Sequence, residues 1–368
     1  MDEDSKLPFY AKASLFLIGL VAFTAILYIA RSIIIPIVFS IIFAILLHPV
    51  VNFFVRFKIN RIIAIVFTLF LTSLILFGFF ALLFSQASQF SDTWPQLVDK
   101  FTETVNEAIS GISGYFDINP LKIHSWITKT KDEFLDVSNE AIGQTLLSVG
   151  GVIMVLFLIP VYVFLMLYYH PIIIEFIHRL FRETHQTQVK EIVSQTKSVI
   201  HQYLVGLLIE AVIVAIMNIS VLLILGVDYA VLLGIIGALL NVIPYIGGLV
   251  GVALPMMVAL ATKTSGWYPI YVMAGYYIIQ LIDNNYIVPY IVASKVKINA
   301  LFSIIVVFIG NALWGVPGMF LSIPLIAIVK LIFDHIDSLK PWGFLLGDTM
   351  PPLINVKPVI VKLKGKPI

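Results

Sequence analysis

Residues 280–289 read Gln-Leu-Ile-Asp-Asn-Asn-Tyr-Ile-Val-Pro and lie inside an apolar run that extends from residue 268 to 292. The run is long enough to cross a bilayer, because a membrane-spanning helix needs about 20 residues. Its centre nevertheless contains four polar side chains, Gln280, Asp283, Asn284 and Asn285. Such groups are costly in hydrocarbon, so they should face protein or a water-filled cavity. This stretch therefore predicts a functional site within a membrane.

The composition assigns the whole chain to the membrane proteins. Of its 368 residues, 60% are hydrophobic and 12% are charged, whereas soluble domains carry about 25% charged residues. A net charge of +2 is too small to indicate a nucleic-acid partner. The chain has no cysteine, which excludes disulfides, thiolate metal sites and cysteine nucleophiles.

No motif in the sequence indicates an enzyme. The seven histidines show no metal-ligand spacing, and no phosphate-binding Gly-Lys motif occurs. Neither a second catalytic Asp nor a Ser–Lys or His–Glu pairing accompanies the intramembrane polar residues. We therefore expect no catalytic residue, no metal, no cofactor and no ATP-driven step in this chain.

Hydropathy predicts an all-α polytopic membrane protein with about six full transmembrane helices, at residues 13–30, 33–55, 62–84, 146–169, 203–225 and 268–292. Basic residues cluster at 56–61, at 170–201 and in the lysine-rich tail. Because basic loops remain on the cytoplasmic side, we expect both termini in the cytoplasm.

The same pattern divides the chain into five regions. Residues 1–85 hold transmembrane helices 1–3, and 146–202 hold the fourth with a cytoplasmic amphipathic segment. Residues 203–333 form a transport core, and 334–368 form a cytoplasmic tail. Residues 86–145 form an extracytoplasmic helical insert in which nine acids outnumber four lysines. The insert is either a cap or oligomer contact, or an acidic solvated connector.

Two further apolar segments, residues 230–261 and 300–330, are each broken near the middle. The breaks contain Asn241, Pro244, Gly247 and Gly248 in the first segment, and Asn311, Gly315, Pro317 and Gly318 in the second. A half-segment of about 13 residues spans only about 20 Å as a helix, less than the ~30 Å hydrocarbon core. We therefore expect two re-entrant hairpins whose tips meet near the midplane; kinked full spans are the alternative.

Each broken segment follows a full span. Residues 203–225 precede the first hairpin, and residues 268–292 precede the second. With six spans, the two pairs enter the membrane from opposite sides and so form an inverted repeat. Inverted repeats are typical of secondary transporters, whose site lies at the repeat interface.

Asp283 is the leading candidate for chemistry, since a carboxylate partly out of water can trade a proton or bind a cation. Gln280, Asn284 and Asn285 would line the same face. Glu210 is the second intramembrane carboxylate, while Asn241 and Asn311 mark the two hairpin tips. The alternative is a structural role, in which these side chains hydrogen-bond the broken backbone and cap the half-helices.

Four stretches resemble motifs of the autoinducer-2 exporter family of bacterial membrane transporters. They are Tyr-Leu-Val-Gly at 203–206, Leu-Gly-Ile-Ile-Gly-Ala-Leu-Leu-Asn-Val-Ile-Pro-Tyr-Ile-Gly at 233–247, Gln-Leu-Ile-Asp-Asn-Asn with Pro289, and Gly-Val-Pro-Gly-Met-Phe-Leu-Ser-Ile-Pro at 315–324. The resemblance covers roughly residues 13–333. Three positions depart from the family pattern, namely Gly248, where Pro is frequent, Asp283, where Glu is frequent, and Ala300, where Pro is usual.

The resemblance implies a homo-oligomeric secondary transporter or exporter in the inner membrane of a bacterial cell. Its substrate would be a small polar solute such as autoinducer-2, or a cation in Na⁺(Li⁺)/H⁺ exchange, with H⁺ or Na⁺ as the coupling ion. A passive channel and a non-transporting membrane scaffold are the other two hypotheses that the residues leave open.

Overall fold

The computed structural model describes residues 8–113, 149–181, 186–243, 247–292 and 297–348 of the chain. The predicted all-α polytopic membrane protein is confirmed. Within the described ranges, five helices are long and apolar enough to cross a membrane, or six if the bent pair α5–α6 counts as one span. The long elements are α1 (Phe9–Ile29), α2 (Arg31–Arg56), α3 (Arg61–Ser113), α5 (Val149–Tyr168), α6 (His170–Leu180) and α7 (Gln186–Ile224).

The remaining elements follow in chain order. They are α8 (Ala230–Asn241), α9 (Gly247–Thr262), α10 (Tyr268–Ile282), the π-helix η2 (Asp283–Val292), α11 (Ala300–Trp314), α12 (Val316–His335) and the short α13 (Lys340–Leu346).

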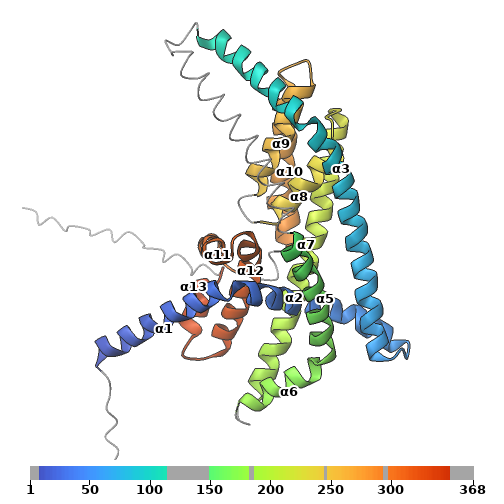
Figure 1. Cartoon of the computed structure of the whole chain (residues 1–368). Helices are drawn as coiled ribbons and strands as arrows, with labels where there is room; N and C mark the ends of the chain where they lie inside the picture. Colours follow the sequence, from blue (N-terminus) through green and yellow to red (C-terminus); the bar gives the residue numbers. More distant parts are fainter. Residues whose placement is uncertain (1–7, 114–148, 182–185, 244–246, 293–296, 349–368) are drawn as a thin grey trace, which may run out of the picture.

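Helix α7 is the long central helix of the molecule. It has 39 residues and is therefore about 58 Å long. Its buried residues recur every three or four positions, as at Tyr203, Leu207, Glu210, Val214 and Asn218, which places them on one face. Figure 1 shows α8, α9 and α10 beside the C-terminal half of α7, and α11 and α12 near its N-terminal half. The membrane core is thus built in two parts along one helix.

The first hairpin consists of α8 and α9. A Cβ added at Gly251 would lie 3.2 Å from the Cα of Gly237, and one added at Gly247 would overlap Asn241. Contacts that converge on the break in this way are those of an antiparallel pair. The hairpin packs against α7, α10 and α3 through a buried cluster that includes Leu222, Leu233 and Val258.

The second hairpin consists of α11 and α12, which are also antiparallel. The Ser322 hydroxyl donates to the carbonyl of Val306 on α11 at 2.8 Å, and Gly310 faces Gly318 nearer the break. Gly315, with φ +65°, forms the break itself, and Pro317 lies in the first turn of α12, where a missing N–H costs nothing. This hairpin packs on α2 and α7 through a cluster that includes Ile42 and Leu321.

Helix α12 differs from the expected half-length segment. It has 20 residues and is long and apolar enough to cross a membrane alone, whereas α8, α9 and α11 have 12, 16 and 15 residues. The expectation that no half-segment reaches spanning length is therefore wrong for α12. The physical reason is that the helix begins directly after Gly315 and continues past Lys330, which pairs with Asp334 one turn later, to His335.

Helix α3 continues past the predicted start of the acidic insert. Phe90 stacks edge-on against Tyr229, the Thr93 hydroxyl lies 2.7 Å from the Tyr229 hydroxyl, and Leu97 is buried against the first hairpin. The beginning of the insert therefore packs on the core. The rest of the insert (114–145) and the end of the tail (349–368) lie outside the described residues, as does Pro244.

Candidate functional site

Asn241, at the tip of the first hairpin, joins the two intramembrane acids. Its side-chain amide nitrogen donates to Asp283 Oδ2 at 2.8 Å and lies 3.4 Å from Glu210 Oε1. An amide NH₂ group carries two hydrogens, so it can serve both carboxylates at once. Asp283 is 1% exposed and Glu210 is 5% exposed. The structure thus brings a hairpin tip and two carboxylates from three separate elements into one buried cluster.

The local backbone explains how each acid reaches the cluster. Glu210 belongs to the buried stripe of α7. Asp283 is the first residue of the π-helix η2, which follows α10 directly. The wider turn of a π-helix shifts the facing of later residues relative to an α-helix, and such segments are rare and frequent at functional sites. Close contact with α7 is possible because a Cβ at Gly206 would lie only 2.5 Å from the carbonyl oxygen of Ile291.

A cavity of about 890 Å³ adjoins the cluster. Its polar lining includes Glu210, Asn241, Gln280, Asp283 and Asn284. Gln280 donates to Asn284 Oδ1 at 3.3 Å, so these two amides form a pair on the wall. The volume lies in the range of small-molecule sites, and a few convergent polar groups on an apolar wall are typical of such sites.

The second hairpin reaches this cavity with its open end and not with its tip. Ala300, Ser303 and Ile323 line the cavity. Its tip lies beside α1 instead, because the Trp314 indole donates to the carbonyl of Leu27 at 3.0 Å. The arrangement in the structure therefore differs from the expected meeting of two tips. The apolar side chains of α12 pack on α2 and α7, and this contact places the break away from Asp283.

Most of the predicted site residues lie together, and some do not. Gly248 also lines the cavity, where a Cβ would overlap the Gln280 side chain. Asn285 is exposed and donates to the carbonyl of Leu281 at 2.8 Å. Asn311 is exposed and outside the cavity lining. The remaining predicted residues lie at the two breaks, Gly247 at the first tip and Gly315, Pro317 and Gly318 at the second.

Several lining residues were not predicted as site residues. Tyr203 and Tyr276 line the cavity beside the acids, and Lys297 and Asp348 contribute charged groups. Asn218 lies two helical turns beyond Glu210 on the same face of α7, and this spacing could have identified it. The tail residues carry no such signal, because the contacts that hold α13 near the start of α11, from Asn299 to the carbonyls of Leu345 and Gly347, are long-range.

Comparison with known proteins identifies the family. The family model described as "AI-2E family transporter" matches residues 17–338. The chain belongs to the AI-2E transporter family. It is accordingly a multi-pass membrane protein of a transport family, and that family is not a class of enzymes.

Three relatives illustrate how similar other members are. The chain is 24% identical over 327 residues to a "Putative transport protein" of Haemophilus influenzae, covering 87% of this chain and 91% of the relative. It is 23% identical over 330 residues to "AI-2 transport protein TqsA" of Escherichia coli, covering 87% and 90%. A shorter match, 28% identical over 110 residues, covers 30% of this chain and 31% of "Putative transport protein YrrI" of Bacillus subtilis.

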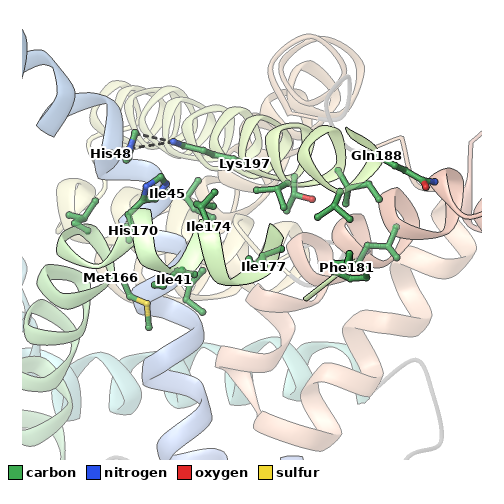
Figure 2. A pocket seen from close by; sticks show the side chains of 18 of the residues that line it. Ile41, Ile45, His48, Met166, His170, Ile174, Ile177, Phe181, Gln188 and Lys197 are labelled. Carbon is green, nitrogen blue, oxygen red and sulfur yellow. Dashed lines mark hydrogen bonds between the residues drawn. The ribbon is translucent and has the colours of Figure 1, made fainter. Parts of the chain in front are cut away.

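A second cavity in this AI-2E transporter has a different character (Figure 2). Its volume is about 980 Å³, and α2, α5, α6 and α7 line it mostly with isoleucine, valine and leucine. At one end, the Lys197 ammonium lies 3.0 Å from His48 Nδ1. The His170 ring is tilted by 36° against the His48 ring, with the two ring centroids 4.8 Å apart. At another, the hydrogen bond and charge of Lys340 hold the pKa of Asp337 below its usual range. An apolar cavity of this kind does not match a polar solute.

Proposed function

We propose that this protein is a secondary-active transporter or exporter of a small polar solute similar to autoinducer-2, coupled to H⁺ or Na⁺. The solute occupies the cavity of about 890 Å³, and Asp283 binds and releases the coupling cation. Gln280, Asn284 and the tip residue Asn241 contact the solute, and Glu210 shares the charge balance with Asp283. Relatives named as transport proteins, one of them for AI-2, support the substrate class.

One observation carries this proposal: two buried carboxylates share a single amide donor, and no basic side chain among the described residues pairs with either. Neither Glu210 nor Asp283 forms a salt bridge within the described part of the chain. Removing two like charges from water without a partner is strongly unfavourable. Binding of a proton or another cation removes this unfavourable free energy, and release of the cation brings it back. Occupancy of the cluster therefore changes the energy of the hairpin tip that Asn241 anchors.

The proposal extends to the membrane arrangement. The two antiparallel helix pairs form the inverted repeat, and the first acts as a re-entrant hairpin because α8 and α9 are each shorter than a span. In the second pair only α11 is shorter than a span. The protein resides in the inner membrane of a bacterial cell with both termini in the cytoplasm, and it forms a homo-oligomer. Lipid contact is supported by α1, whose most apolar window has no buried residue.

A second candidate is Na⁺(Li⁺)/H⁺ exchange without an organic solute. The paired acids favour it, because two carboxylates that cannot both be charged cheaply are suited to exchanging one cation for another. In that case the polar amides of the cavity wall serve as a hydrated path for ions.

Flux into proteoliposomes tests these functions. We expect labelled autoinducer-2 to accumulate against its gradient when a proton or sodium gradient is imposed, and Asp283→Asn to lose this accumulation. Asn285→Ala is the matched control, because Asn285 is exposed and bonds only within its own helix. Ion movement without solute would favour the antiporter. Rapid downhill flux indifferent to Asp283→Asn would indicate a channel, and no flux at all would indicate a scaffold.

A further inference from the structure

Three buried oxygen atoms that have no hydrogen-bond partner within the described part of the chain belong to residues that line a third, very small cavity. They are Asn218 Oδ1, Tyr276 Oη and Asp283 Oδ1, and all three residues line a cavity of about 10 Å³. Their exposed fractions are 2%, 8% and 1%. Buried polar atoms in proteins are nearly always paired, so three unpaired oxygens around one space indicate a ligand.

In the Asn218 amide and in the Asp283 carboxylate, one terminal atom is hydrogen-bonded and the other is not. The Asn218 amide nitrogen lies 3.4 Å from the carbonyl oxygen of Gly234, which orients the amide oxygen towards the cavity side. Asp283 Oδ2 accepts the Asn241 hydrogen bond, so Oδ1 is the atom left over. The unpaired oxygens are thus a consequence of fixed side-chain positions and not of free rotation.

Glycine residues of the first hairpin close this space. Gly237 sits between two of the oxygen-bearing residues, because a Cβ there would lie 3.0 Å from Asn218 Nδ2 and 3.5 Å from Tyr276 Oη. Gly247, Gly248 and Gly251 line the same cavity. A Cβ at Gly237 would press on the Asn218 side chain and touch Tyr276. The site is therefore formed by Asn218 of α7, Tyr276 of α10 and Asp283 of η2, with the first hairpin covering it.

The chemistry of the lining selects a small monovalent cation. About 10 Å³ of cavity volume holds one atom-sized occupant, close to the minimum for one water molecule. The unpaired oxygens belong to a carboxylate, an amide and a phenol. Carboxylate and amide oxygens are among the hard ligands that such cations prefer, and the phenol adds a third, neutral oxygen. Ca²⁺ needs six to eight oxygens. A neutral water molecule would satisfy the hydrogen bonds and leave the buried Asp283 charge without compensation.

We propose that one Na⁺ ion binds in this small cavity, coordinated by Asp283 Oδ1, Asn218 Oδ1 and Tyr276 Oη. The ion is separate from the solute, which occupies the larger cavity that also has Asp283 in its lining. Because Asp283 contacts both the ion and the hairpin tip residue Asn241, the ion controls how firmly the tip is held. The role of the ion in driving transport rests on the proposed function, whereas binding of the ion to this cavity does not depend on it.

Sodium titration of the purified full-length protein tests the site. Binding is followed by isothermal calorimetry and by thermal midpoint in NaCl against choline chloride at equal ionic strength. We expect saturable stabilisation by Na⁺ in the wild type and at least a tenfold loss of affinity in Tyr276→Phe, which removes one oxygen. Tyr271→Phe is the matched control, because Tyr271 lies on the same helix and is half exposed. Unchanged midpoints in sodium-free buffer verify that both variants fold.

The outcomes separate this site from the transport proposal. Equal midpoints in NaCl and choline chloride, or equal Na⁺ affinity in Tyr276→Phe and the wild type, would overturn the sodium site. If solute accumulation still followed a proton gradient in sodium-free medium, the transport proposal would stand without it. Saturable Na⁺ binding that depends on Tyr276, in a protein that moves no solute, would leave the ion site in place and remove the transport function.

Discussion

The two helical hairpins share a construction and differ in what their tips contact. Both are antiparallel pairs with close glycine contacts next to the break. The tip of the first presents Asn241 to two buried carboxylates. The tip of the second presents Trp314 to a backbone carbonyl of α1. The first tip is thus held by hydrogen bonds to two carboxylates, and the second by packing and one neutral hydrogen bond.

This difference indicates a division of roles between the hairpins. A contact with a carboxylate changes strength when that carboxylate binds a cation, whereas a contact with a carbonyl does not. We therefore assign the ligand-sensitive part of the molecule to the first hairpin and the fixed frame to the second. The helix lengths agree with this assignment, because among the four helices of the two hairpins only α12 is long enough to span the membrane.

Removing the two tip asparagines gives the largest expected contrast. Asn241→Ala deprives two buried acids of their shared donor, and a hydrogen bond to a charged group contributes about 1.5–3 kcal/mol, or roughly ten- to hundredfold in rate. Asn311→Ala removes an exposed side chain outside the cavity. We expect initial flux to fall at least about tenfold in the first variant and to stay within about twofold in the second. Equal losses would restore the symmetric arrangement expected from the sequence.

Alanine at Gly310 of the second hairpin should destabilise the protein more than alanine at Gly251 of the first. A Cβ at Gly310 would overlap Ser322 Oγ and lie 2.8 Å from the carbonyl carbon of Gly318, so backbone must move. A Cβ at Gly251 lies 3.2 Å from Gly237 Cα, which needs a shift of only a few tenths of an ångström. Overpacking costs about 1–3 kcal/mol, and we expect most of this in Gly310→Ala.

Thermal midpoints in detergent measure this second contrast. Gly19→Ala is the control, because nothing lies within 4 Å of a Cβ at that position. A larger drop for Gly251→Ala than for Gly310→Ala would mean that the first hairpin is the rigid frame, and the assignment of roles would be reversed.

The sequence predicted most of the spans, the breaks and the position of the central acid because these depend on local properties. The predicted span at 268–292 is instead the 15-residue α10 followed by the π-helix η2. Apolar length and the interruptions at Asn241 and Gly315 follow from hydropathy and from backbone preferences. Each of these depends only on residues that are close together in the sequence. The prediction that the tips meet was different in kind. It depended on how α12 packs against α2 and α7, and no local pattern encodes the direction of that packing.

The small cavity illustrates the same limit within the site. Asn218 and Asp283 are 65 positions apart in sequence, and they line one space only because α7, η2 and the first hairpin pack together. The change from α-helix to π-helix at Asp283 cannot be read from composition either. Pro289 predicts that the helix is irregular in this region, but it does not specify a π-helix. Sequence identified the polar residues, and tertiary packing decided which of them converge.

The smallest expected effect tests whether the second tip is independent of the site. Trp314→Phe keeps the ring and removes the hydrogen bond to the Leu27 carbonyl, which is worth about 0.5–1.5 kcal/mol. We expect faster amide hydrogen exchange in residues 20–29 of α1 and unchanged exchange in 230–241 of the first hairpin. Trp342→Phe is the control, because Trp342 is 58% exposed. If the second hairpin is a fixed frame, loss of a contact at its tip should not affect the first hairpin. Altered exchange at 230–241 would show that the two hairpins move together, and the division of roles would be wrong.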